Sequence, residues 1–159
     1  MSKTLINDLI EQYKHTFRIV NQEIERFTDQ DWLEGFSFFQ VPVNQAVHLL
    51  DCLDFYFRED EVDDYQWGYR FGGGWWELDE EQLPGKNEVL DYTRELEYLI
   101  LEKLASLDDV SLSETSPIQF EWAQTRLGLY IYALRHTLHH HGELAALAVY
   151  HGHEGGSWE

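Results

Sequence analysis

The sequence predicts an all-α fold, a four-helix bundle in a single domain over residues 1–159. Apolar residues recur at intervals of three and four through most of the chain, which is the period of an amphipathic helix. The three prolines stand at positions 42, 84 and 117, each at or before the expected start of a helix, where proline is tolerated. No segment alternates clearly enough to compete as a strand, so no strand is predicted.

The first helix is expected over residues 3–27. The run Thr28–Asp31 resembles a capping box, which predicts a short turn of helix through Trp32. Residues 28–41 then form a short join. The apolar stripe of this helix comprises Leu5, Leu9, Ile10, Tyr13, Phe17, Val20, Ile24 and Phe27.

The second helix is expected from Pro42 to about Asp60, and the third from Asn87, as its N-cap, to Leu107. The stripe of the second comprises Ala46, Leu49, Leu50, Leu53 and Phe57. The stripe of the third comprises Val89, Leu90, Leu96, Leu99, Ile100 and Leu104.

The connection over residues 61–86 is irregular and rich in glycine and aromatic residues. A connection of this length is often a lid or a binding loop, in which Trp75 and Trp76 would contact a substrate. The alternative is that it crosses the bundle and buries its aromatic side chains for stability. In either case its length allows the second and third helices to run parallel.

The fourth helix is expected from about Pro117 to Tyr150, after a short join over 108–116. His136 and His140 lie within about 40° of each other on its surface, and Glu143 shares their face. A second apolar stripe lies opposite, so one face can meet the core and the other a second subunit. That stripe comprises Leu127, Ile131, Leu134, Leu138, Ala145 and Val149.

Composition narrows the classes of partner. Thirty acidic and 11 basic residues give a net charge of −19, which disfavours nucleic acids and anionic membranes. Aromatic residues make up 15% of the chain, as in folded rather than disordered acidic proteins. Cys52 is the single cysteine, so an internal disulfide framework is excluded. The first residues do not resemble a signal peptide, no apolar run approaches a membrane span, and a cytoplasmic protein is expected.

The histidines are the candidate metal ligands. Two imidazoles at positions i and i+4 of a helix can bind one ion, which makes His136 and His140 a candidate pair. A catalytic site needs a third ligand, for which His48 is the best candidate, with His15 and Cys52 as competitors.

Three neighbours of the pair have separate expected roles. Glu143 could be a ligand, an outer hydrogen-bond partner or a general base. His139 and His141 point away from the shared face and are interpreted as interface or surface groups.

Several familiar catalytic patterns are missing. The chain has no His-Glu-x-x-His and no Glu-x-x-His, which argues against a zincin and a di-iron carboxylate bundle. It also has no Gly-x-Ser-x-Gly and no phosphate-binding loop.

The histidine pattern resembles the DinB-like (DinB/YfiT) superfamily. The matching segments are Val47–Leu50, which contains His48, and the late run His136–Leu144. The resemblance implies a four-helix bundle with a long crossover and a homodimer. It also implies a divalent metal, typically zinc or nickel, held by His48, His136 and His140 with open water positions. The family often has Arg-Gly-Gln after the second ligand, where this chain has an added carboxylate in His141–Glu143.

The resemblance also implies a class of function. Family members of known activity are metal-dependent hydrolases or thiol transferases that use low-molecular-weight thiols such as bacillithiol or mycothiol. The expected function is therefore a metal-dependent enzyme that acts on a small electrophilic molecule. The alternatives are a non-catalytic stress-response protein that binds a metal or ligand, and a structural role in which the histidines only pack a dimer interface.

Overall fold

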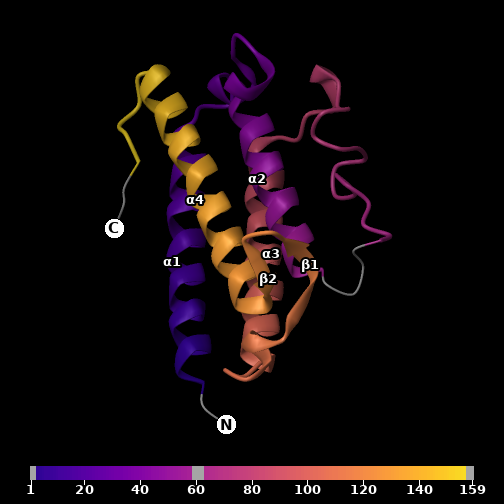
Figure 1. Cartoon of the computed structure of the whole chain (residues 1–159). Helices are drawn as coiled ribbons and strands as arrows, with labels where there is room; N and C mark the ends of the chain where they lie inside the picture. The colour runs from indigo at the N-terminus through magenta and orange to yellow at the C-terminus, as the bar shows by residue number, and fades with distance from the viewer. Residues whose placement is uncertain (1–2, 59–62, 157–159) are drawn as a thin grey trace.

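The computed structural model describes residues 3–58 and 63–156, and this part of the chain is mostly helical. The expected helical bundle is confirmed, with four long helices packed side by side (Figure 1). Their bounds are α1 Thr4–Arg26, α2 Pro42–Phe57, α3 Lys86–Ser106 and α4 Arg126–Tyr150.

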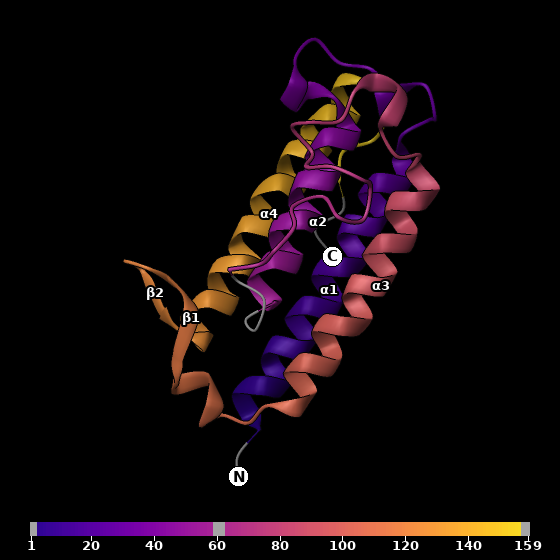
Figure 2. The ribbon, with the colours of Figure 1, turned by 90° about the vertical axis from the view of Figure 1, so that its right-hand side faces the viewer.

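The helices α1 and α4 run in one direction and α2 and α3 in the other (Figures 1 and 2). Each of α1 and α2 packs against both α3 and α4. The described part of the long connection returns along the outside of α2 to the start of α3 (Figure 2), so the parallel arrangement of α2 and α3 is confirmed. Residues 61 and 62 of the expected loop lie outside the described residues.

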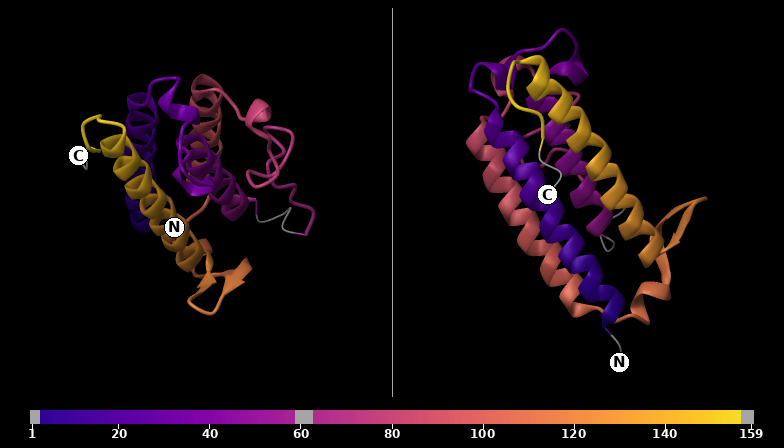
Figure 3. Two further views of the ribbon diagram at one scale, coloured as in Figure 1. Left: turned by 90° about the horizontal axis from the view of Figure 1, so that it is seen from above. Right: turned by 90° about the vertical axis from the view of Figure 1, so that its left-hand side faces the viewer.

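The predicted turn after α1 is also confirmed. The Thr28 Oγ1 atom accepts a hydrogen bond from the Asp31 N–H at 3.1 Å, and the Asp31 carboxylate accepts one from the Thr28 hydroxyl at 2.6 Å. A 3₁₀ turn follows over Asp31–Leu33. A second 3₁₀ turn, Phe38–Gln40, leads into α2 (Figure 3).

Two helix ends differ from the prediction. The helix α2 ends at Phe57 rather than near Asp60, because Arg58 adopts φ −92° and ψ 53°; residues 59 and 60 lie outside the described part. The helix α3 starts before Asn87, with Gly85 as its N-cap, because the Glu88 carboxylate accepts a hydrogen bond from the Gly85 N–H at 2.8 Å.

The prediction that Pro117 begins the fourth helix is wrong, as is the prediction of no strands. A two-stranded antiparallel sheet, β1 Thr115–Phe120 and β2 Ala123–Thr125, precedes α4. Residues in β1 alternate between exposed and buried, with Ser116 and Ile118 inside. The helix begins only at Arg126, because the Thr125 hydroxyl oxygen caps it by accepting from the Gly128 N–H at 3.2 Å.

The core lies between the four helices and continues under the long connection. Large buried side chains reach polar partners across it: the Tyr13 hydroxyl donates to the Tyr130 carbonyl at 2.7 Å, and the Trp32 indole to the Pro84 carbonyl at 3.0 Å. Trp67, Phe71 and Trp75 of the connection pack against this core. Within residues 3–58 and 63–156, no helix has the length and apolar character needed to cross a membrane.

Candidate metal centre

Three histidines from two helices meet at one point. His48 lies in the second turn of α2, and His136 and His140 occupy successive turns of α4, which packs against α2. The Nε2 atom of His140 lies 3.1 Å from that of His48 and 3.3 Å from that of His136. The expected trio is therefore brought together by the packing of α2 on α4.

The spacing of these nitrogens fits a divalent metal. One ligand atom from each ring lies within 4.8 Å of the other two. Nitrogens bound to a tetrahedral zinc ion at about 2.0–2.1 Å are separated by roughly 3.3 Å. The observed Nε2 separations, 3.1 and 3.3 Å, match that requirement.

All three rings favour the neutral form that binds metals. Burial, together with the two neighbouring imidazoles, lowers the pKa of His48 to about 3. Burial and the adjacent His140 lower the pKa of His136 to about 4. Burial also lowers the pKa of His140, although Glu143 acts in the opposite direction. At neutral pH each ring can therefore offer a nitrogen lone pair.

Side chains behind His140 set the orientation of its ring. Its Nδ1 atom lies 2.6 Å from a Glu143 carboxylate oxygen and 3.1 Å from the Gln45 side-chain oxygen. Both are acceptors, so Nδ1 carries the proton and Nε2 keeps its lone pair towards the other histidines. The sequence left three roles for Glu143, and this contact is the one expected of an outer hydrogen-bond partner.

The two competing ligands do not join the trio. His15 lies on α1, where its Nδ1 atom is 2.8 Å from an Arg18 guanidinium nitrogen. The Cys52 sulfur lies beside the His48 ring, 3.6 Å from Nδ1 and 3.9 Å from Nε2, but it is not part of the group of converging ligand atoms. Burial raises the pKa of the Cys52 thiol to about 12, which favours the protonated form.

The other two histidines of the late run lie elsewhere. The His139 side chain is 67% exposed and its Nε2 atom is 3.5 Å from Glu143. With His140 and Glu143 it forms a second possible donor set, on the outer surface of α4. The interpretation of His141 as a surface group is wrong for the single chain: its ring is 3% exposed and faces the buried Glu23 at 3.9 Å.

An aromatic shell surrounds the three histidines. The Trp75 ring packs on His48 with centroids 4.4 Å apart, and Phe39 contacts the same imidazole at 6.3 Å. Tyr56 and Tyr132 pack against His136 at 5.8 and 6.1 Å. Such a shell limits access of water to a bound ion.

The two tryptophans expected at the substrate differ in position. Trp75 lies against His48, whereas Trp76 is 50% exposed and packs on Trp75 at 5.3 Å. Of these two tryptophans, Trp75 is the one whose ring contacts a member of the trio.

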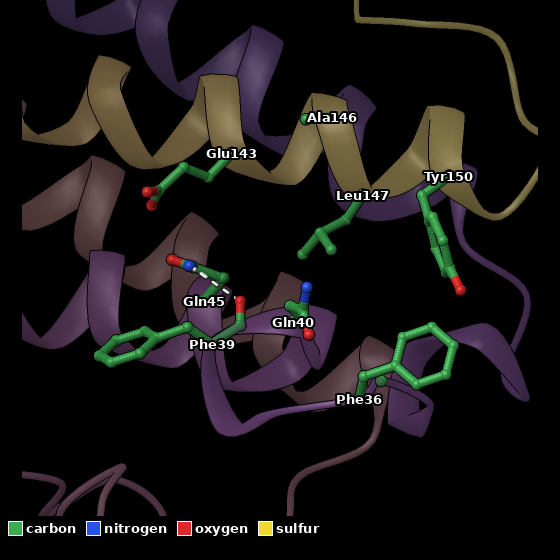
Figure 4. Close-up of a pocket in the computed structure, with 9 residues that line it drawn as sticks. Phe36, Phe39, Gln40, Gln45, Glu143, Ala146, Leu147 and Tyr150 are labelled. Atoms are coloured by element: carbon green, nitrogen blue, oxygen red, sulfur yellow. Dashed lines mark hydrogen bonds between the residues drawn. The ribbon is translucent and has the colours of Figure 1, made fainter.

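A cavity of about 370 Å³ opens beside the trio, between α4 and the segment that leads into α2 (Figure 4). Glu143 and Gln45, which hold His140, line one end, and Phe36 and Tyr150 line the other. The described residues that line it are Gly35, Phe36, Phe39, Gln40, Gln45, Glu143, Ala146, Leu147 and Tyr150.

Sequence reasoning missed Gln45, Phe39, Tyr56 and Tyr132. The spacing of Gln45 three residues before His48 places both on one face of α2, which is a usable signal. The two tyrosines and Phe39 had no comparable signal, because aromatic residues at helical spacing are common in cores.

No family model matches the chain, and no curated protein matches it.

Proposed function

We propose that this protein is a divalent-metal-dependent enzyme, a hydrolase or thiol-dependent S-transferase that acts on a small electrophilic molecule. We also propose membership of the DinB-like superfamily, which the antiparallel pairs of helices and the long crossover support. The observation that carries the proposal is the convergence of three neutral imidazoles on one point.

His48, His136 and His140 would hold the ion. Imidazole ligands suit zinc, copper, iron and nickel, and the resemblance to the DinB-like superfamily favours zinc or nickel among these. Three protein ligands are typical of catalytic rather than structural zinc sites, because a further position stays available. Such an ion lowers the pKa of a water or a thiol and so supplies a nucleophile at neutral pH.

The remaining residues would support that chemistry from outside. Glu143 and Gln45 fix the tautomer and orientation of His140 through its Nδ1 atom. Trp75 and Phe39 cover His48 and exclude water from that side. Glu143, whose carboxylate lies 2.6 Å from Nδ1 of His140, is also the candidate general base.

The first test is the metal content of untagged protein by elemental analysis, beside His48→Ala and His136→Ala variants. We expect about one zinc or nickel ion per chain in the wild type, as one three-histidine site requires, and loss of the ion in both variants. His15→Ala is the matched control and should keep its metal. The absence of metal after reconstitution would overturn the proposal.

The second test separates an enzyme from a non-catalytic binding protein. Metal-loaded protein is assayed with activated esters, amides and electrophiles, with and without a low-molecular-weight thiol. We expect turnover that a chelator abolishes and that His136→Ala lacks. Full metal occupancy without turnover of any of these substrates would instead favour the binding protein.

A homodimer and a cytoplasmic location belong to the same proposal. The outer stripe of α4 supports the dimer, because Ile131 and Val149 are 52% and 57% exposed although both are large and apolar. Sedimentation of the purified protein tests it, with Ile131→Glu expected to give a monomer.

A further inference from the structure

The cavity beside the trio has the size of a binding site for a small molecule. Its volume of about 370 Å³ lies at the lower end of the range for ligand pockets, about 300–1,000 Å³. It extends along α4 from Glu143 to Tyr150, a rise of about 10 Å for seven helical residues. Those dimensions suit a compound of one or two rings.

The far end of the cavity is aromatic. Phe36 and Tyr150 come from segments far apart in the sequence and meet edge to face with centroids 5.7 Å apart (Figure 4). Phe36 is 80% exposed and Tyr150 60% exposed, so neither ring contributes much to the core. Exposed aromatic rings at the rim of a cavity indicate a place where a flat apolar group binds.

The near end is polar and carries a negative charge. The Glu143 side chain is 40% exposed, and its carboxylate accepts from His140 with one oxygen, which leaves lone pairs for a ligand donor. Gln45 is less available, because its amide nitrogen donates to the Phe39 carbonyl at 3.0 Å (Figure 4).

Among the described residues that line the cavity there is no lysine or arginine. The net charge of the whole chain, −19, adds to the repulsion of anions. An anionic head group would therefore meet the Glu143 carboxylate, with no lysine or arginine among the described wall residues to compensate its charge.

We propose that this cavity binds an uncharged aryl compound with a hydrogen-bond donor in its head group, such as an aryl amide. The ring lies against Phe36 and Tyr150, and the head group donates to Glu143. Binding of the ring and head group does not need a metal, so this inference goes beyond the proposed function and can be tested separately from it.

The test uses two probes of the same shape, 2-naphthamide and 2-naphthoate, titrated calorimetrically into chelator-treated protein. We expect the amide to bind and the carboxylate to bind at least severalfold more weakly, because of the nearby carboxylate. In Tyr150→Ala the affinity for the amide should fall about tenfold, the effect of losing one aromatic partner. Tyr98→Ala, which removes a 66% exposed tyrosine from α3, is the matched control and should bind normally.

Glu143→Gln tests the polar end. The ratio of the affinity for 2-naphthamide to that for 2-naphthoate should be smaller in this variant, because the charge that repels the carboxylate is gone. Equal binding of the amide by Tyr150→Ala and Tyr98→Ala would overturn the proposal, as would tighter binding of the carboxylate by the chelated wild type. Circular dichroism of each variant confirms that it is folded.

The two proposals fail in different ways. If the wild-type protein binds no metal but binds the amide, the metal-dependent function is contradicted and the aryl site stands. Metal binding and turnover without amide binding in the chelated protein would contradict the aryl site alone.

Discussion

A histidine contacts a carboxylate both in the three-histidine cluster and near the C-terminal end of the chain, and these two regions use the imidazole ring differently. In the three-histidine cluster, His48, His136 and His140 turn Nε2 atoms towards one another. In what we call the C-terminal clamp, His151 and His153 both turn a nitrogen towards Asp31, at 3.3 and 2.9 Å.

The difference lies in what each ring nitrogen faces. In the clamp, one nitrogen of each ring faces the same Asp31 carboxylate, and both rings pack edge-on against Phe27 at 6.2 and 6.1 Å. That arrangement ties the end of the chain to the turn after α1. In the cluster, the carboxylate of Glu143 holds only the outer nitrogen of one ring, and the inner nitrogens remain available to an ion. Similar residues thus give a clamp in one region and a candidate metal-binding group in the other.

The largest expected difference between the regions is in their response to metal. Zinc at 100 times its dissociation constant should stabilise the wild type by about 2.7 kcal/mol, because a folded site binds the ion and the unfolded chain does not. His140→Ala should abolish this increase, measured as the free energy of unfolding in urea. His153→Ala should keep it, since the clamp is not one of the groups of described residues whose ligand atoms all lie within 4.8 Å of one another.

Stabilisation by zinc in His140→Ala equal to that in the wild type would mean that the ion binds outside the cluster. Its loss in His153→Ala would make the clamp part of the metal site and so remove the contrast between the two regions.

The second prediction concerns the carboxylate of the cluster. Glu143→Gln keeps the shape of the side chain but weakens the acceptor for Nδ1 of His140, so the ring becomes a poorer ligand. We expect one ion per chain to remain, with an affinity lower by about 10–100-fold, the usual effect of losing an outer partner. Competition with a fluorescent zinc chelator measures this constant, and an unchanged affinity would contradict the role given to Glu143.

The third prediction concerns the carboxylate of the clamp. Asp31→Asn should lower the free energy of unfolding at pH 7 by about 1–2 kcal/mol, because hydrogen bonds to a charged acceptor are lost. Metal affinity should not change. A variant as stable as the wild type would show that the clamp contributes nothing to the fold.

The same variant has a pH signature. Hydrogen bonds from Thr28 and His153 lower the pKa of Asp31 from 3.8 to about 2 in the folded protein. A carboxyl whose pKa is lower when folded stabilises fully above its unfolded pKa, and this stabilisation is lost as the pH falls towards the folded value. The free energy of unfolding of the wild type should therefore fall to that of Asp31→Asn between about pH 4 and pH 2. Urea titrations at several pH values measure this difference.

Much of the fold could be predicted because helical periodicity is a property of the chain alone. The bounds of α1 and the turn at Asp31 follow from a stripe of apolar residues and a local capping pattern. The hairpin before α4 could not be predicted in this way. Its six- and three-residue strands are too short for a clear alternation, and the cap at Thr125 competed with the proline signal at Pro117.

The site was predictable to the extent that its residues share a helix. The spacing of His136 and His140 pairs them on α4. His48 joins them because α2 packs on α4, and the only indication of that packing in the sequence was the resemblance to the DinB-like superfamily. The burial of His141 beside Glu23 depends on the position of α1, which no local pattern encodes. The clamp likewise joins residues 122 positions apart.

The smallest expected effect belongs to His139, and it distinguishes the two donor sets that share His140. One set uses the inner Nε2 atom with His48 and His136, and the other uses the outer Nδ1 side with Glu143 and the exposed His139. If the ion occupies the inner set, His139→Ala should leave its affinity and stoichiometry unchanged, because that ring contributes no inner ligand. The measurement is the same chelator competition, with His136→Ala beside it. A large loss in His139→Ala with retention in His136→Ala would move the metal to the surface of α4, where an ion would lie outside the aromatic shell of Trp75 and Tyr56.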